Sequence, residues 1–211
     1  MDYLKKIGKR QELNLLRKEN NMKKIILAST SPERKKLLEN TGLIFEVIPS
    51  NYEEDMTLEM SSEDLAMFLS KGKGEDVAIR TKDAIIISAD TFVSFNNQLI
   101  GKPHTEEKAF ITLRTLSGET HSVFTGFTII DTKENKTVSR VVETKVSFKE
   151  LSDEMINDYI REGNPLNYAG SYTLNDIKDK FIEKIEGDHN NIIGLPLDEV
   201  LETLKEFDVN N

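Results

Sequence analysis

Residues 29–32 have the sequence Ser-Thr-Ser-Pro and combine hydroxyl groups with a signal for the start of a helix. The apolar run at residues 25–28 predicts a buried strand, while Ser31 and Pro32 suit the N-cap and first position of a helix. A helix that begins directly after a strand presents free backbone N–H groups and a positive dipole end, which together bind phosphate oxygens. Arg34 would add further N–H donors. A capped helix without a ligand is the alternative interpretation, since such caps are common.

Three charged residues farther along the chain could act beside such an anion site. Asp90 follows the predicted buried strand at residues 84–89, and a carboxylate just past a buried strand lies where α/β sheets place ligands. It could hold a divalent cation or orient a water molecule. Glu54, in an acidic triplet, could supply a second carboxylate, although such triplets are usually solvated loops. Lys102, in a Gly-Lys-Pro turn, would present a compact positive charge, although such tripeptides are usually surface turns.

The elements that must position these residues mix βα units with an antiparallel meander. The pattern predicts strands at 25–28, 44–48 and 84–89, a hairpin at 92–100 turning at Asn96 and Asn97, and a long antiparallel pair at 121–131 and 137–148. It predicts helices from Pro32 to about Gly42 and at 61–80, 105–116, 152–161 and 196–207. Residues 163–194 have no clear assignment. This order predicts an α/β fold with a mixed, largely antiparallel sheet flanked by helices.

Composition excludes several classes of function. The 211 residues include 28 Lys and Arg against 37 Asp and Glu, a formal charge of -9, which argues against a general nucleic-acid binder. The absence of Cys excludes disulfides, thiolate nucleophiles and Cys-ligated zinc, and it fits a reducing compartment such as the cytoplasm. The longest apolar run has five residues, at positions 65–69, so no membrane span is expected.

The two ends and the histidines have simpler interpretations. Residues 1–21 are polar and Lys-rich and predict a partly helical N-terminal extension without a secretory signal. Residues 208–211 are expected to form a tail. His121 invites a catalytic role, but without a Cys or a nucleophile elbow we expect a structural one.

Six blocks together form a pattern that none carries alone. They read Ile-Leu-Ala-Ser-x-Ser-Pro-x-Arg-x-x-Leu-Leu at 26–38, Ala-Asp-Thr-x-Val at 89–93, Gly-Lys-Pro at 101–103, Leu-Ser-Gly-x-x-His-x-Val-x-Thr-Gly at 116–126, Ala-Gly-x-Tyr at 169–172 and Gly-Leu-Pro-Leu at 194–197. In this order they resemble the Maf-like nucleoside triphosphate pyrophosphatases, and the resemblance runs from about Met22 to Leu204.

The resemblance implies a single catalytic domain at residues 22–207, with an elongated sheet and two lobes around a cleft. It implies metal-dependent hydrolysis of a nucleoside triphosphate to the monophosphate and pyrophosphate, using Mg²⁺ or Mn²⁺, and a homodimer. The family positions match Asp90 as proton acceptor, Lys102 and Lys73 as catalytic cations, and Glu54 beside Asp90 at the metal. The residue types suit the reaction, in which Ser29, Ser31 and Arg34 would help to hold the triphosphate.

The chain departs from the family at positions associated with the base. Glu33 stands where the family has Arg or Trp, Asn175 where it has Gln or Glu, and Tyr168 where Lys is frequent. Thr91 matches the subgroup that favours dTTP and UTP. One hypothesis is that Glu33 accepts two hydrogen bonds from a base such as guanine; the alternative is that it faces solvent, where an acid suits the helix dipole.

Two other classes of function stay open. The chain could be a nucleotide-binding regulatory protein with weak or no catalysis, because the departures fall at the pocket. It could also be a structural interaction module, which would have no affinity for triphosphates.

Overall fold

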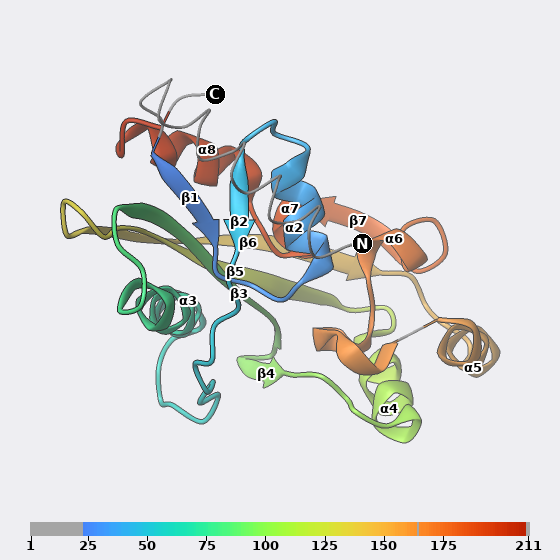
Figure 1. Ribbon diagram of the computed structural model, residues 1–211. Coiled ribbons are helices and arrows are strands. Elements are labelled where there is room, and N and C mark those ends of the chain that lie inside the picture. The colour runs from blue at the N-terminus through green and yellow to red at the C-terminus, as the bar shows by residue number, and fades with distance from the viewer. Residues whose placement is uncertain (1–22, 164, 210–211) are drawn as a thin grey trace, which may run out of the picture.

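The computed structural model describes residues 23–163 and 165–209, and seven strands of this part form one mixed sheet (Figure 1). The order is β2-β1-β3-β5-β6-β7, with β4 paired to β3. The strands are β1 (Lys24–Leu27), β2 (Phe45–Val47), β3 (Ala84–Phe95), β4 (Gln98–Ile100), β5 (Thr120–Asp131), β6 (Lys136–Phe148) and β7 (Ile182–Glu186). β1 runs parallel to β2 and β3, and every other pairing is antiparallel. The predicted mixed, largely antiparallel sheet is confirmed.

Helices lie on both faces of this sheet. They are α2 (Pro32–Glu39), α3 (Ser62–Ala78), α4 (Glu106–Leu116), α5 (Asp153–Glu162), α6 (Leu174–Ile177), α7 (His189–Ile193) and α8 (Leu197–Lys205), with 3₁₀ turns η1 (Pro165–Asn167) and η2 (Ala169–Ser171). The side chains of Ser31, Ser61, Thr105 and Ser152 accept a backbone N–H at the starts of α2, α3, α4 and α5. Hydroxyl caps of this kind explain why the predicted helices agree with the structure to within a few residues.

β3 is longer than the sequence predicts. One strand of 12 residues runs through the segment that was expected to hold a strand end and a separate hairpin arm. The polar residues near its middle suggested that end, but the Ser88 hydroxyl donates to Ser70 O at 2.7 Å in α3 and is satisfied inside the fold. The turn itself is where it was predicted, with positive φ at Asn96 and Asn97.

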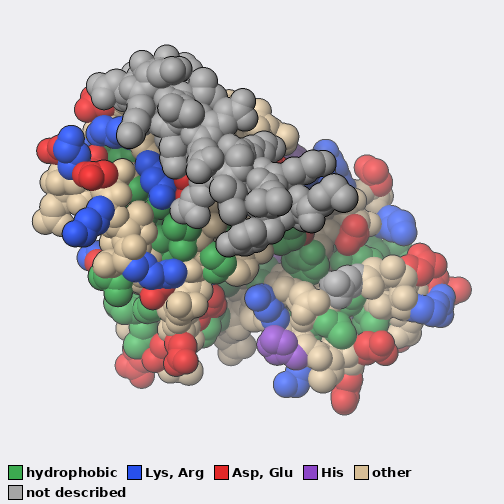
Figure 2. Space-filling model, viewed as in Figure 1, with side chains coloured by type: hydrophobic (Ala, Val, Ile, Leu, Met, Phe, Trp, Pro, Cys, Tyr) green, Lys and Arg blue, Asp and Glu red, His purple; other side chains and the backbone are tan. Residues whose placement is uncertain are grey.

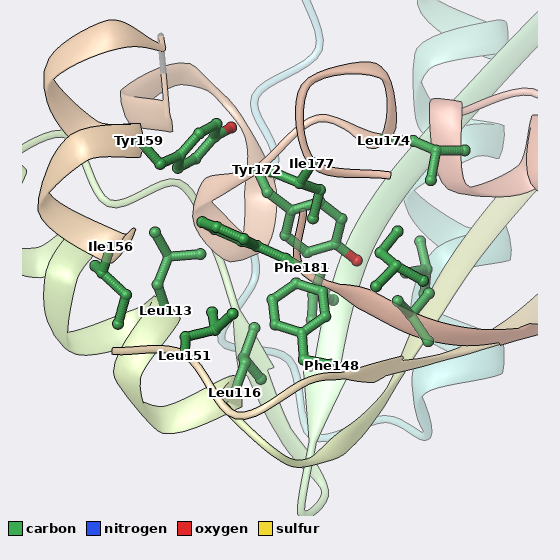
Figure 3. Close-up of a cluster of buried hydrophobic side chains, with 14 residues drawn as sticks. Leu113, Leu116, Phe148, Leu151, Ile156, Tyr159, Tyr172, Leu174, Ile177 and Phe181 are labelled. Carbon is green, nitrogen blue, oxygen red and sulfur yellow. The ribbon is translucent and has the colours of Figure 1, made fainter. Parts of the chain in front are cut away.

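One face of the sheet carries two hydrophobic clusters at opposite ends of the long strands. Alternation places Ile85, Ile87 and Phe127 against α2 and α8 in the first cluster. Farther along the same face, Val93 and Val123 belong to the second cluster. Figure 3 shows how that cluster is filled by side chains of α4, α5, α6 and the loops around them. The two clusters therefore rise from one face, and Ile193 packs against both.

The opposite face is covered by α3, which packs closely on β3 and β5. Leu65 and Leu69 are fully buried there against Phe92 and Phe124. The close approach requires a glycine, because a Cβ on Gly126 would lie 2.0 Å from the carbonyl oxygen of Ala66. The position of α3 relative to the sheet is thus set by a backbone contact.

The ends of the described chain are attached to the domain. Lys23 Nζ lies 3.1 Å from Asp131 Oδ2 and 2.8 Å from Phe207 O. Val209 donates its N–H to Leu204 O and packs on the first cluster, so the prediction of a tail from residue 208 is wrong for this residue. The predicted extension at residues 1–21 lies outside the described residues.

The surface mixes charges of both signs. On the face in Figure 2, basic and acidic side chains are interspersed outside the grey atoms. Among the described residues, no helix combines the length and apolar character that crossing a membrane requires.

Candidate active site

The candidate site begins at a gap along one edge of β3. β1 pairs with β3 as far as Leu27 and Ile87, and β4 pairs with it only from Val93 onward. Between them, residues 88–92 of β3 have no strand partner on that side among the described residues. Side chains from both faces of β3 can therefore reach the same opening.

A cavity of about 410 Å³ occupies this opening. Nine of the predicted site residues line it: Ser29, Ser31, Glu33, Arg34, Glu54, Lys73, Asp90, Thr91 and Lys102. Other lining residues, which the sequence did not assign to a site, include Tyr52, Val93, Val123, Ala169, Tyr172, Ile192 and Ile193. The structure thus brings segments far apart in the sequence into one pocket.

Asp90 lies at the centre of a charged cluster. It is 4% exposed and stands within β3, so the expectation that it follows the end of a strand is wrong. Its Oδ1 contacts the ammonium of Lys73, which also lies 2.6 Å from Glu54 Oε1. Lys73 comes from α3, on the face toward which Asp90 points. One cation thus bridges two carboxylates and fixes the orientation of Asp90.

Glu54 depends on the loop between β2 and α3. Asp76 of α3 accepts hydrogen bonds from Ser50 Oγ at 3.2 Å and from Asn51 N at 2.9 Å. Hydrogen bonds from Asn51 and Arg80 hold the pKa of Asp76 below its usual range. Because this carboxylate ties the loop to α3, it fixes the segment that carries Glu54.

Arg34 reaches the pocket from the opposite face. Its Nε donates to Gly194 O at 2.7 Å and its Nη2 donates to Thr91 Oγ1 at 2.9 Å. Burial lowers the pKa of the guanidinium, while Asp90 and Glu54 act in the opposite direction. A guanidinium remains protonated in proteins, so a desolvated positive charge stands ready for an anion.

The turn before α2 completes the charged end of the pocket. Ser29 Oγ accepts from Ser31 N at 3.1 Å, and Ser31 Oγ accepts from Arg34 N at 3.3 Å as the helix N-cap. The start of the eight-residue helix α2 therefore faces the cavity, as predicted. Lys102 is exposed at the rim and forms no ion pair with the described residues.

The other end of the pocket is apolar. Val93, Val123 and Tyr172 belong to the second hydrophobic cluster, and Ile192 and Ile193 pack against it. The apolar residues that line this end were not assigned to the site from the sequence. They come from four separate segments, and an apolar side chain by itself indicates only a place in the core.

Two predictions about the base-selecting positions need correction or refinement. Asn175 lies on α6, is exposed and does not line the cavity. The short helix buries its neighbours Leu174 and Ile177 instead, which turns Asn175 to the surface. Glu33 lines the cavity, is half-buried and accepts a hydrogen bond from the Tyr168 hydroxyl.

His121 is a structural residue, as expected. It is 2% exposed, does not line the cavity, and its Nε2 lies 2.7 Å from the hydroxyl of Tyr172. Its ring also packs edge-on against Phe148. Burial lowers the pKa of His121 to about 4.

The residues that line the pocket indicate which class of α/β protein this is. Its pocket offers cations and a helix N-terminus at one end, an apolar wall at the other, and a buried carboxylate beside the cations. It thus suits a molecule with an anionic part and an apolar part. The chain belongs to the family of Maf-like proteins, whose model matches residues 24–207.

Named relatives support this assignment along nearly the whole chain. A dTTP/UTP pyrophosphatase of Thermoanaerobacter sp. (strain X514) is 46% identical over 188 residues, which cover 88% of this chain and 98% of the relative. A dTTP/UTP pyrophosphatase of Bacillus cereus (strain ATCC 10987 / NRS 248) is 40% identical over 198 residues, covering 94% and 97% respectively.

Proposed function

We propose that this chain hydrolyses a nucleoside triphosphate to the nucleoside monophosphate and pyrophosphate, with dTTP and UTP as preferred substrates. One observation carries the proposal: buried Asp90, paired with Lys73, lines the same pocket as further cations and a set of apolar side chains. The names of the relatives support both the reaction and the pyrimidine substrates.

The two ends of the pocket give the substrate one orientation. The triphosphate would lie against Arg34, Lys102 and the start of α2, where cations and backbone N–H groups offset its charge. The base would lie against Val93, Val123 and their apolar neighbours. In this orientation the innermost phosphorus faces Asp90.

Asp90 would act as the general base. Its Oδ1 is held by Lys73, while its Oδ2 has no hydrogen-bond partner among the described residues. That oxygen would orient a water molecule toward the innermost phosphorus and accept its proton. Arg34 and Lys102 would stabilise the charge that develops on the phosphoryl oxygens and the leaving pyrophosphate.

The residues also fit a divalent cation, Mg²⁺ or Mn²⁺. Within residues 23–163 and 165–209, no group of three or more His, Asp or Glu is placed to hold a metal ion. Asp90 and Glu54 nevertheless share one ammonium partner, so their oxygens lie close together. Mg²⁺ commonly binds one or two carboxylates plus substrate phosphates, and this pair suits a cation that binds with the nucleotide. When bound, the cation would neutralise charge on the phosphates.

A pyrophosphate-release assay tests the proposal. We expect wild-type protein with Mg²⁺ to release pyrophosphate from dTTP and UTP, and Asp90→Asn to reduce turnover roughly 10²- to 10⁴-fold, the usual contribution of a general base. Tight triphosphate binding without release would favour a regulatory protein. No binding would favour an interaction module.

We also propose that the protein works in the cytoplasm as a homodimer. The absence of Cys and a nucleotide substrate support that compartment. Sedimentation equilibrium would test the dimer, and a monomer at micromolar concentration would refute it.

A further inference from the structure

Tyr168 lies between η1 and η2, and its phenol joins two sides of the pocket. The hydroxyl donates a hydrogen bond to Glu33 Oε1 at 3.1 Å, although the two residues are 135 positions apart. Both residues line the cavity. Burial and the charge of Glu33 raise the pKa of Tyr168, so the phenol keeps its proton and remains a donor.

Both oxygens of Glu33 are already engaged. Its Oε2 accepts a hydrogen bond from Ser31 Oγ at 3.0 Å, and Ser31 is itself fixed as the cap of α2. A base edge that offered two donors to Glu33 would have to compete with both hydroxyls. The geometry therefore favours a role for Glu33 in holding Tyr168 over direct contact with a base.

The backbone beside Tyr168 is fixed as well. Gly170 has φ +71°, and a Cβ at this position would lie 2.8 Å from Val93 Cγ2, so the segment packs tightly on β3. Ala169 and Tyr172, on either side of this glycine, line the apolar end of the pocket. The Tyr168 ring is thus held through its backbone on one side and its hydroxyl on the other.

We propose that Tyr168 is a specificity-determining residue whose ring bounds the base-binding end of the pocket and favours one-ring bases over two-ring bases. Glu33 is a positioning residue that acts through Tyr168. This inference rests on the proposed function, because it assigns the base-binding end of the same pocket. A wall fixed at two points leaves less room for a purine than a mobile side chain would, and its face can stack on a pyrimidine.

The first experiment measures kcat/KM for dTTP, UTP, dATP and dGTP. We expect Tyr168→Ala to lower kcat/KM for dTTP roughly 5- to 150-fold, the range for loss of a base–aromatic contact. We expect the ratio of dTTP to dGTP to fall at least about 10-fold, mainly through KM. Tyr52→Ala is the matched control, since its ring lies against α3 at Gly72, and we expect it to leave this ratio unchanged. An unchanged ratio in Tyr168→Ala would overturn the proposal, as would an equal change in Tyr52→Ala.

The second experiment separates the roles of Tyr168 and Glu33. Tyr168→Phe keeps the ring but removes the hydrogen bond to Glu33. We expect Tyr168→Phe and Glu33→Ala to lower the dTTP-to-dGTP ratio of kcat/KM by similar amounts. If Glu33 acts through Tyr168, the double variant should show no further shift, because coupled residues are non-additive. A full additional effect of Glu33→Ala in the Tyr168→Phe background would assign direct base contact to Glu33 and refute the positioning role.

Binding measurements keep this inference distinct from the proposed function. Dissociation constants for the same four triphosphates, measured by calorimetry in EDTA, report base preference without turnover. Wild-type protein that releases no pyrophosphate would refute the proposed function. A dTTP-to-dGTP ratio of dissociation constants that is the same in wild type and Tyr168→Ala would refute the inference.

Discussion

His121 should make the protein less stable below neutral pH without taking part in catalysis. The ring is buried against Phe148 and Tyr172, with centroid distances of 4.9 and 5.6 Å. Its Nδ1 has no hydrogen-bond partner among the described residues. A second proton would place an uncompensated charge in an apolar cluster, and this burial lowers the pKa of His121 from 6.5 to about 4.

The size of the effect follows from linkage. The unfolded chain binds the proton near pH 6.5 and the folded protein only near pH 4, so stability is full above pH 6.5 and falls as the pH decreases. At about 1.4 kcal/mol per pKa unit, the total loss is roughly 3 kcal/mol. Between pH 7.5 and pH 5 the same relation gives a loss of about 2 kcal/mol. The pKa values of Asp76 and Asp131 are also lowered in the folded protein. The stability that these two carboxylates contribute is lost only at lower pH, as the pH falls below the usual pKa range of carboxyl groups.

Urea unfolding at pH 7.5 and pH 5 measures this loss. We expect the free energy of unfolding to be lower at pH 5 than at pH 7.5 both in wild type and in the control His104→Asn. His104 is an exposed histidine with a positive φ that Asn tolerates. In His121→Gln the difference between the two pH values should be much smaller. An NMR titration of the His121 ring gives a second measurement that does not depend on a variant. A ring that titrates near pH 6.5 in the folded protein would refute the reasoning.

Three further substitutions test contacts around the pocket. Lys73→Met should reduce turnover roughly 10²- to 10³-fold, since one lost stabilising group in a catalytic site has that effect; near-normal pyrophosphate release would contradict its role. Asp76→Asn should loosen the loop before α3, so that the Asn51 amide exchanges hydrogen faster and turnover falls by roughly 10-fold or more. Unchanged exchange would show that another contact holds the loop. Gly126→Ala should lower the free energy of unfolding by about 1–3 kcal/mol, as overpacking does. Gly101→Ala is the control, because a Cβ there meets nothing within 4 Å, and it should leave the free energy of unfolding unchanged. Equal denaturation midpoints for the two variants would contradict the argument that α3 approaches Gly126 too closely for a Cβ.

Local signals in the sequence were sufficient for the elements and for part of the site. The Ser-Thr-Ser-Pro turn carries its own cap, so the start of α2 and the approach of Arg34 follow from neighbouring residues. Asp90 was also found, although for an incomplete reason. A polar residue after an apolar run suggests a strand end, whereas β3 continues because Lys73 from α3 neutralises the buried carboxylate. That partner is 17 residues away, and spacing alone does not reveal it.

The apolar end of the pocket could not be derived from spacing in the same way. The bond between Glu33 and Tyr168 joins residues 135 positions apart, and one of them lies in the segment at 163–194 that had no clear periodicity. Short 3₁₀ turns and four- or five-residue helices leave too few residues for a repeating pattern. Asn175 shows the same limit, because the burial of Leu174 and Ile177 sets its direction.

The gap in strand pairing explains how neighbouring residues serve opposite sides of one site. Successive side chains on a strand point to opposite faces, so Asp90 meets Lys73 on the α3 face while Thr91 meets Arg34 on the other. In a fully paired sheet these two contacts would be separated by the sheet itself. Here β1 has ended and β4 has not begun, so both contacts border one opening. Extending β1 past Leu27 would close the opening, and the Ser-Thr-Ser-Pro turn, which diverts the chain into α2, prevents this. The same four residues therefore cap a helix, line the charged end of the pocket and keep the edge of β3 accessible.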